Sequence, residues 1–269
     1  MSTVQFDVSG AMVCWDPADC LQHAARDAFL AAGFGDLAPK PRTDYEALKE
    51  ALGELKGKDE LVQRHRAHER HGCELVSVLR GEEENQYLRQ FGVKIRAGCV
   101  VVDDTTCINA DKLQTLYEEA KAKVSARAIS VCLVEVVRSL TGVRIRENGA
   151  LYWIPEESVH RLGLLADALA SAGGANLMLL RTALDERAAR HVTEGLTREV
   201  MKQCEAICEE VATLGTEEAI ERRKTQAFRM RCLVERYSTI LNDGLEGLKK
   251  AIGLAETAAV MAAMQAVAA

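Results

Sequence analysis

Apolar residues recur at helical spacing through the last third of the chain. From residue 184 the pattern is helical to the end, with one interruption at Gly215-Thr216, where a second helix is predicted to begin. The apolar positions on both sides keep the three-, four- and seven-residue spacing of a coiled-coil seam. The residues of this predicted seam are Leu196, Val200, Ile207, Val211, Ile220, Val234, Leu241, Leu248 and Ile252. We therefore predict an antiparallel helical hairpin over residues 184–269, with a second helix much longer than the first.

The pattern has a different period between residues 60 and 104. Short apolar runs occupy residues 61–62, 75–79, 87–95 and 99–102, and glycines separate them. Runs of this length bounded by glycine are typical of strands. The segment is predicted to form an antiparallel meander.

Capping signals place two helices around this meander. Thr43 with Glu46 three residues later has the pattern of a capping box, which predicts a short helix through Leu55. Asn109 is an N-cap for a long apolar-periodic segment that continues to about Leu140. Asn148-Gly149 between two apolar runs is a strong hairpin signal.

Composition supports a helix-rich protein with a smaller sheet. The chain has 269 residues, of which 48% are hydrophobic, 28% charged and only 4% aromatic. Long charged helices fit these shares better than a β-sandwich does. The predicted fold class is α+β, with a mixed domain that contains an antiparallel sheet over residues 1–183 and the coiled coil over residues 184–269.

Charge and cysteine content indicate a cytoplasmic protein. The formal net charge of −6 excludes an overall basic nucleic-acid coat but leaves room for a local basic face. The N-terminal residues lack the pattern of a secretory signal, and the apolar tail Ala258–Ala269 is too short to span a bilayer. Nine cysteines without framework spacing are expected to be reduced and mostly buried.

Basic and aromatic residues are interleaved on the predicted strands. Such a face can bind a phosphate backbone and stack on bases. The candidate nucleic-acid-binding residues are Arg64, Arg66, Arg89, Lys94, Arg96, Arg144, Arg146, Tyr87 and Trp153. The acidic run Glu82–Glu84 lies among them, so a solvated face of mixed charge is the alternative interpretation.

Two sets of residues have side chains that can bind metals. His65, His68 and His71 precede Cys73, but residues three apart on a strand point to opposite faces, which favours a solvated hairpin edge over a zinc site. Asp103-Asp104 follow an apolar strand, a position where enzymes hold Mg²⁺, although they also lead directly into the next helix. Because the chain contains no phosphate-binding, dinucleotide-binding or nucleophile-elbow motif, we expect no metal, no cofactor and no enzymatic activity.

The segment Thr141–Pro155, followed by a Leu-rich helix and a long helical region, resembles an uncharacterised family of bacterial and phage proteins. Those proteins have a Gly-Gly-Val-Tyr-Phe-Val-Pro-like hairpin at this place, where this chain has residues 148–151 as Asn-Gly-Ala-Leu. Residues 37–48 are similar to the family as well. The resemblance implies a mixed α/β head with a coiled-coil tail, is compatible with a phage or mobile-element origin, and implies no activity or catalytic residues.

The hypothesis that these observations favour is a non-enzymatic interaction or assembly protein. It would self-associate as a homo-oligomer, or bind a protein partner, through the C-terminal coiled coil, because sustained amphipathic seams are association devices. The alternative is a nucleic-acid-binding protein that uses the basic, aromatic-bearing sheet face. A metal-dependent phosphoryl-transfer enzyme is the third hypothesis.

Overall fold

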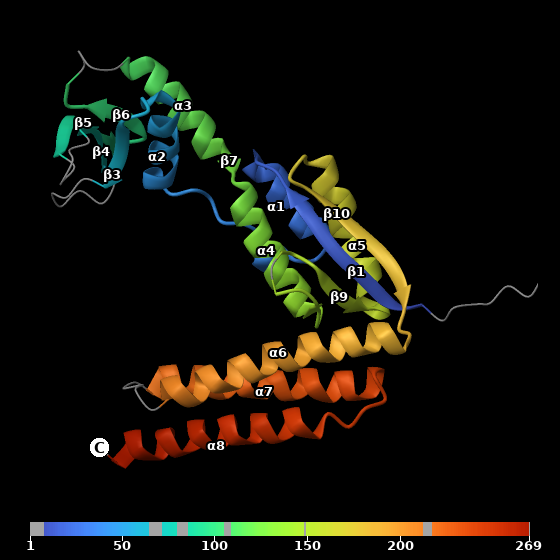
Figure 1. Cartoon of the computed structure of the whole chain (residues 1–269). Coiled ribbons are helices and arrows are strands. Elements are labelled where there is room, and N and C mark those ends of the chain that lie inside the picture. The colour runs from blue at the N-terminus through green and yellow to red at the C-terminus, as the bar shows by residue number, and fades with distance from the viewer. Residues whose placement is uncertain are drawn as a thin grey trace, which may run out of the picture. The chain divides into compact units, whose positions relative to one another are not determined.

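A computed structural model describes residues 8–64, 72–79, 86–104, 109–147, 149–211 and 217–268 (Figure 1). The chain forms two compact units, each of which is discontinuous in sequence. Unit 1 comprises Met1–Trp15, Val134–Gly163 and Leu177–Ala269, and unit 2 comprises Asp16–Leu133 and Leu164–Asn176. This division differs from the predicted boundary after residue 183. Strands from the beginning and from the end of the predicted domain 1–183 belong to the same unit as the C-terminal helices.

The sheet of unit 1 has the strand order β10-β1-β9-β8. Its strands are β1 (Val8–Pro17), β8 (Val143–Arg144), β9 (Tyr152–Pro155) and β10 (Ala175–Ala183). β9 pairs antiparallel with both β1 and β8, so the predicted hairpin around Gly149 is confirmed. Gly10 of β1 lies against the ring of Trp153, and a Cβ at this position would come within 2.5 Å of that ring. Only glycine permits this close approach without a shift.

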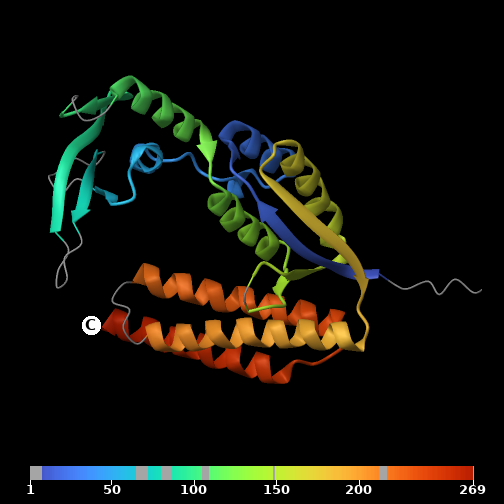
Figure 2. The same cartoon turned by 45° about the horizontal axis from the view of Figure 1, so that its top comes forward.

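Three helices form the C-terminal part of unit 1: α6 (Glu186–Val211), α7 (Glu217–Ile240) and α8 (Glu246–Ala268) (Figure 2). The prediction of a two-helix hairpin is therefore wrong, although the α+β class is confirmed. The predicted second helix ends at Ile240 because Asn242 and Leu245 adopt positive φ angles of 50°. The side chain of Asp243 accepts a hydrogen bond from the Leu245 backbone N–H at 3.1 Å, which stabilises this turn. α8 folds back and packs on both α6 and α7.

Unit 2 contains the predicted meander as an antiparallel sheet in the order β3-β4-β5-β6. Its strands are β3 (Glu60–Arg64), β4 (Gly72–Leu79), β5 (Gln86–Arg96) and β6 (Cys99–Val102). The helices α2 (Asp44–Leu55) and α3 (Ala110–Ala122) share a core with this sheet. Leu48, Leu75, Phe91 and Leu113 are buried in it.

The predicted long helix from Asn109 to about Leu140 is two helices, α3 and α4 (Ala126–Ser139). Between them, β7 (Lys123–Val124) pairs with β2 (Cys20–Leu21), which precedes α1 (Gln22–Ala31) and the short 3₁₀ helix η1 (Gly35–Leu37). The break is stabilised by Ser125 Oγ, which accepts from the Ala128 N–H at 3.2 Å, and by Asp19, which accepts from the Ala126 N–H at 2.8 Å. The remaining helix, α5 (Glu156–Ser171), follows β9.

Both predicted caps in unit 2 are confirmed. Thr43 and Glu46 form a reciprocal capping box at the start of α2, and Asn109 accepts a hydrogen bond from the Lys112 N–H at 3.0 Å at the start of α3. The hydrogen bonds from Thr43 lower the pKa of the Glu46 carboxyl. Arg42, immediately before α2, is only 8% exposed, and its guanidinium donates to the Ala120 carbonyl at 3.1 Å. Its charge is compensated by the nearby Asp19 and Glu50 carboxylates, as a buried cation requires.

Candidate interaction surface

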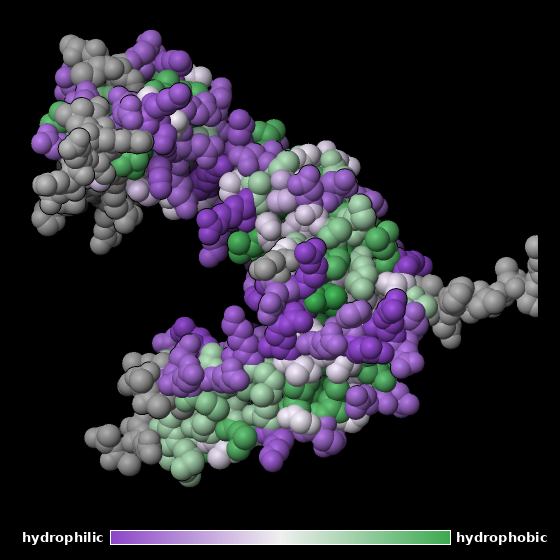
Figure 3. All heavy atoms as spheres, viewed as in Figure 1, coloured by the Kyte–Doolittle hydropathy of each residue, from purple (hydrophilic) through white to green (hydrophobic). Residues whose placement is uncertain are grey.

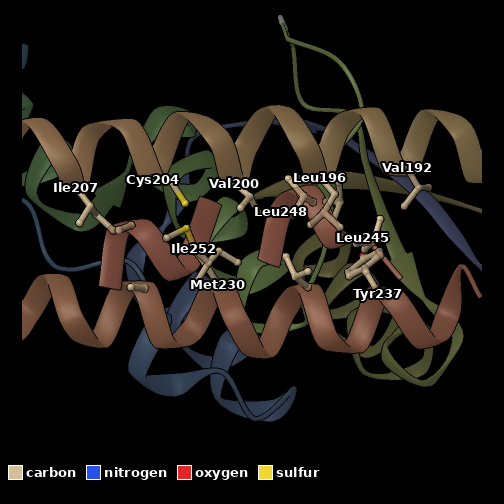
Figure 4. Packing of buried hydrophobic residues seen from close by; sticks show 14 of the residues in the cluster. Val192, Leu196, Val200, Cys204, Ile207, Met230, Tyr237, Leu245, Leu248 and Ile252 are labelled. Atoms are coloured by element: carbon tan, nitrogen blue, oxygen red, sulfur yellow. The ribbon is translucent and has the colours of Figure 1, made fainter. Parts of the chain in front are cut away.

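The predicted coiled-coil seam forms the interior of the three-helix bundle (Figure 4). Six of its residues lie in one buried apolar cluster: Leu196, Val200, Ile207, Val234, Leu248 and Ile252. Ile220 is 1% exposed, Leu241 packs at the edge of the cluster, and the side chain of Val211 lies outside the described residues. These positions therefore stabilise a single chain. An interaction surface on the bundle must be formed by other residues.

The bundle is anchored to the β8–β9 hairpin of the same unit by Tyr237 on α7. Its side chain is fully buried, and the hydroxyl donates a hydrogen bond to the Thr141 carbonyl at 2.7 Å. Its ring contacts Trp153 in a T-shaped arrangement with 5.8 Å between the ring centroids. Burial raises the pKa of the Tyr237 phenol far above its ordinary value, so the hydroxyl stays protonated as a donor.

Charged residues on the outer faces of α6 and α7 are compensated within the chain. Arg223 of α7 pairs with Glu210 of α6, Arg231 of α7 pairs with Glu256 of α8, and Arg236 pairs with Glu157 of α5. The hydrogen bond from Arg236 is the main cause that lowers the pKa of Glu157. These exposed or half-exposed pairs add little stability individually. They place charge on the outer faces of both helices, beside single exposed apolar residues such as Phe228 and Met201.

The side of α8 that faces away from the bundle core is apolar and exposed. Leu254 is 62% exposed, Met261 58% and Met264 70%, and Thr257 is exposed between them. We call these four residues the outward seam. Their spacing of three, four and three residues repeats the spacing of a coiled-coil contact, and Val260 beside them is 47% exposed. Figure 3 shows the apolar side chains gathered over this helix.

α8 also has very few charges along this side. Between residues 251 and 268 the only ionisable side chain is Glu256, which is paired with Arg231. On the opposite side of the same helix, Leu248, Ile252, Ala255 and Ala259 point into the cluster. A helix that is apolar on all sides is typical of a buried helix rather than a surface helix. The sequence predicted the inward residues as a seam, but the outward seam was missed because the two patterns overlap in one Ala-rich segment.

The candidate nucleic-acid-binding residues do not share a sheet. Tyr87, Arg89, Lys94 and Arg96 lie on β5 in unit 2, whereas Arg144 and Trp153 lie on β8 and β9 in unit 1, with Arg146 just beyond β8. Arg64 ends β3, with its side chain outside the described part of the chain, and Arg66 lies outside it altogether. Trp153 is 0% exposed and cannot stack on a base. The single basic, aromatic-bearing sheet face that the sequence predicts is therefore not present as one surface.

Arg89, the central residue of that prediction, is engaged by two carboxylates. Its guanidinium contacts Glu74 at 3.1 Å and also pairs with Asp103. Burial alone would raise the pKa of Asp103, but hydrogen bonds from the Gly92 N–H at 2.7 Å and from Arg89 lower it below its ordinary value. Bonding to Asp103 in turn raises the pKa of Arg89. A phosphate would have to displace these carboxylates from Arg89, and a magnesium ion would have to displace Arg89 from Asp103.

Among the remaining candidate nucleic-acid-binding residues, some have contacts within the chain and others are exposed to solvent. Arg144 donates to the Gly149 carbonyl at 3.1 Å and lies over the ring of Tyr152 at 5.8 Å from its centroid. Tyr87 is 56% exposed and Arg96 is exposed at the far end of the same strand. Arg146 is exposed as well, but it lies beyond β8 in unit 1, so the exposed candidates among the described residues are not on one sheet.

The histidines of the predicted zinc set, His65, His68 and His71, lie outside the described residues, and Cys73 is fully buried in the core of unit 2. Within the described ranges, no three His, Cys, Asp or Glu side chains are placed so that they could hold a metal ion together. Burial raises the pKa of the Cys204 thiol to about 11. Cys20, Cys73 and Cys204 are buried, as expected. The expectation of buried thiols is wrong for Cys99, Cys208 and Cys232, which are exposed.

A pocket of about 330 Å³ opens in unit 2 between the sheet and the start of α3. Its walls are formed by Leu55, Glu60, Leu75, Gln90, Phe91, Asn109 and Lys112. The side chains provide no pair of nucleophile and base at which covalent chemistry could start. The outward seam of α8 is therefore the stronger candidate for a functional surface.

The fold and this surface define an α+β protein with a C-terminal three-helix bundle that exposes one apolar helix side. Residues 20–268 match the family of unknown function DUF6744, and the chain belongs to this family. No curated protein and no solved structure matches the chain. None of the helices in the described ranges combines the length and apolar character that crossing a membrane requires.

Proposed function

We propose that this chain is a non-enzymatic assembly protein that associates with another protein chain through the outward seam of α8. The observation that carries the proposal is the exposure of Leu254, Met261 and Met264 at coiled-coil spacing on a helix side that has no charged residue after Lys250. Contiguous exposed apolar surface bounded by polar residues marks interaction sites in folded proteins.

The energetics of the exposed side chains support this function. Removing apolar surface from water stabilises a contact by roughly 25 cal/mol per Å², and three large side chains of the outward seam are each more than half exposed. α6 and α7 provide a contrast in the same bundle, because their outer faces bear ion pairs such as Arg223–Glu210. Phe228 of α7 and Met201 of α6 are exposed as well, but α8 exposes three large apolar side chains along its length, Leu254, Met261 and Met264.

The other two functions have weaker support. The nucleic-acid interface has less support because Arg89 is engaged by Glu74 and Asp103, and because one of its two candidate stacking residues, Trp153, is buried. A phosphoryl-transfer site would need the Asp103 carboxylate free of Arg89 and the Gly92 N–H. Association through α8 requires no rearrangement of the described residues.

The hairpin resemblance around Thr141–Pro155 extends the proposal to the setting of the assembly. We propose that the chain serves an assembly of a phage or another mobile element, because this hairpin resembles that of an uncharacterised family of bacterial and phage proteins. Sequencing the flanking genes tests this: structural or packaging genes of a phage beside it would support the setting, and a conserved metabolic operon would contradict it.

Site-specific photo-crosslinking tests the proposed function. A photoreactive amino acid is placed at Met261 in the full chain, and at Val131 of α4, which is 57% exposed, as a matched control. Irradiation in the source cell should give a discrete crosslinked product, of the chain with itself or with one other protein, from position 261 and not from position 131. No product from 261, or the same products from both positions, would contradict the proposal.

A further inference from the structure

We infer that the chain seated on the outward seam of α8 is α8 of a second copy, which packs antiparallel across a two-fold axis at the level of Ala259. This inference rests on the proposed function and specifies its partner. The contact would be isologous, so each copy contributes the same four residues, as in most closed dimers.

The outward seam can pack against the outward seam of a second copy that runs in the opposite direction. In an antiparallel coiled coil, an a position of one helix faces a d position of the other. With Leu254 and Met261 at a, and Thr257 and Met264 at d, an axis at the level of Ala259 sets Leu254 opposite Met264 of the second copy. The same axis sets Thr257 opposite Met261 of the second copy. In this register all four residues of each copy are covered.

The residues beside the outward seam permit close packing of two copies. In the heptad frame, the e and g positions that flank the outward seam are Gly253, Ala258, Val260 and Gln265. Charged side chains at e and g usually set partner choice and orientation in coiled coils. Here these positions give no charge with which a different protein could be selected, and none that would repel an identical helix. The outward seam of another copy matches this surface, because it has the same large apolar side chains between the same uncharged flanking residues.

The lysines at the start of α8 determine the orientation. Lys249 and Lys250 precede the outward seam, and Lys250 is exposed on the same side of the helix. In a parallel pair the lysines of the two copies would lie side by side, and like charges at close range are unfavourable. In the antiparallel pair they lie beside the uncharged second half of the partner helix, so the antiparallel arrangement is favoured.

The mass of the full chain in solution tests the inference. Sedimentation equilibrium at micromolar concentration should give twice the chain mass of 29.4 kDa. Met261→Glu or Met264→Glu should weaken the dimer by about ten- to a hundredfold in dissociation constant, since burying a charge replaces the burial of a large apolar side chain. Met201→Glu is the matched control, because Met201 lies on α6 and is already 37% exposed; this variant should stay dimeric.

A charge-pair variant tests the register. Leu254→Lys and Met264→Glu should each weaken the dimer alone, and combining them should restore part of the affinity, because the two new side chains face each other only in the antiparallel arrangement. Ten residues separate the two positions, so they cannot pair within one helix. Circular dichroism verifies that each variant is folded.

The outcomes separate this inference from the proposed function. A dimer that is lost in the single variants and partly recovered in the double variant supports the second copy in this register. A dimer without recovery overturns the antiparallel register. A monomeric chain that still crosslinks another protein from position 261 overturns the inference and leaves the proposed function standing, and a monomer without crosslinks overturns both.

Discussion

The sheet β3-β4-β5-β6 bears residues that the sequence suggests for binding, whereas the outward seam of α8 was found only in the structure, and the surroundings of the two surfaces differ. On the sheet, the guanidinium of Arg89 is already compensated by Glu74 and Asp103. On α8, the apolar side chains of Leu254 and Met261 have water as their surroundings. A surface is suited to binding a partner when its charges are not already paired, or its apolar side chains not already buried, within its own chain. By this criterion the outer side of α8 is suited and the sheet is not.

The largest expected difference is between substitutions on the two sides of α8, in their effect on the free energy of unfolding. Ile252→Ala removes a side chain that is 1% exposed in the core cluster, and we expect a loss of about 2–5 kcal/mol in the free energy of unfolding. Met261→Ala on the outward seam should cost about 0.5 kcal/mol or less in the monomer. Urea unfolding at a concentration too low for association measures both values. Equal losses would show that the outward seam belongs to the folded core of one chain.

The core beneath the sheet should respond to alkaline pH. Burial, and then the hydrogen bond to Asp44 at 2.9 Å, raise the pKa of Tyr117 to about 12. Because this value lies above the unfolded value of about 10, the contribution of Tyr117 is fully present below pH 10 and is lost as the pH rises toward 12. The loss should reach about 2–3 kcal/mol. Unfolding measured across this range should show a smaller slope for Tyr117→Phe, and an unchanged slope would refute the linkage.

Removing the cation from the sheet should have a moderate effect. Arg89→Met removes the cation that pairs with the Glu74 and Asp103 carboxylates, and since these groups are partly exposed we expect a loss of about 1 kcal/mol or less in the free energy of unfolding. The pKa of Asp103 is lowered in the folded chain, so the contribution of the pair is present at neutral pH and is lost as the pH falls through that value. Arg96→Met on the same strand is the control. If both variants lose the same stability, the network around Arg89 has no special role.

The smallest effect is expected when nucleic acid is added to the protein. We expect labelled single- and double-stranded oligonucleotides to show no binding at about 100 µM, which is weaker than the usual nonspecific range. Fluorescence anisotropy at low and at physiological salt measures this. Tight binding that weakens when Arg96 or Tyr87 is replaced would restore the nucleic-acid hypothesis.

Much of the fold could be predicted because its signals are local. The capping box of Thr43 and Glu46, the cap at Asn109 and the glycine-bounded strands of the meander each depend on a few neighbouring residues. The break between α3 and α4 depends on Asp19, far away in sequence, and the long apolar period hid the local signal of Ser125. The turn at Asn242 has ordinary turn residues, but the seven-residue spacing continued across it.

The functional surface was harder to predict than the fold. Apolar spacing showed that residues such as Val200 and Ile252 pack against helices, and the structure places them in the core of one chain. Whether a seam faces inward or outward depends on how many helices the chain supplies to cover it, and the sequence pattern predicted two rather than three. Similarly, a list of basic residues does not show which carboxylates fold back onto Arg89.

The discontinuity of unit 1 has a consequence for the order of folding during synthesis. Gly10 of β1 pairs with Pro155 of β9, and the apolar cluster that contains Trp153 is completed by Ile252 and Ala259. A nascent chain therefore holds β1 unpaired while more than half of the sequence is made, and the core of unit 1 cannot close until the ribosome has reached α8. Unit 2, with most of its residues between Asp16 and Leu133, can fold much earlier. Long-range pairing of this kind slows folding, so unit 1 is the part of the chain most exposed to misassembly before synthesis ends.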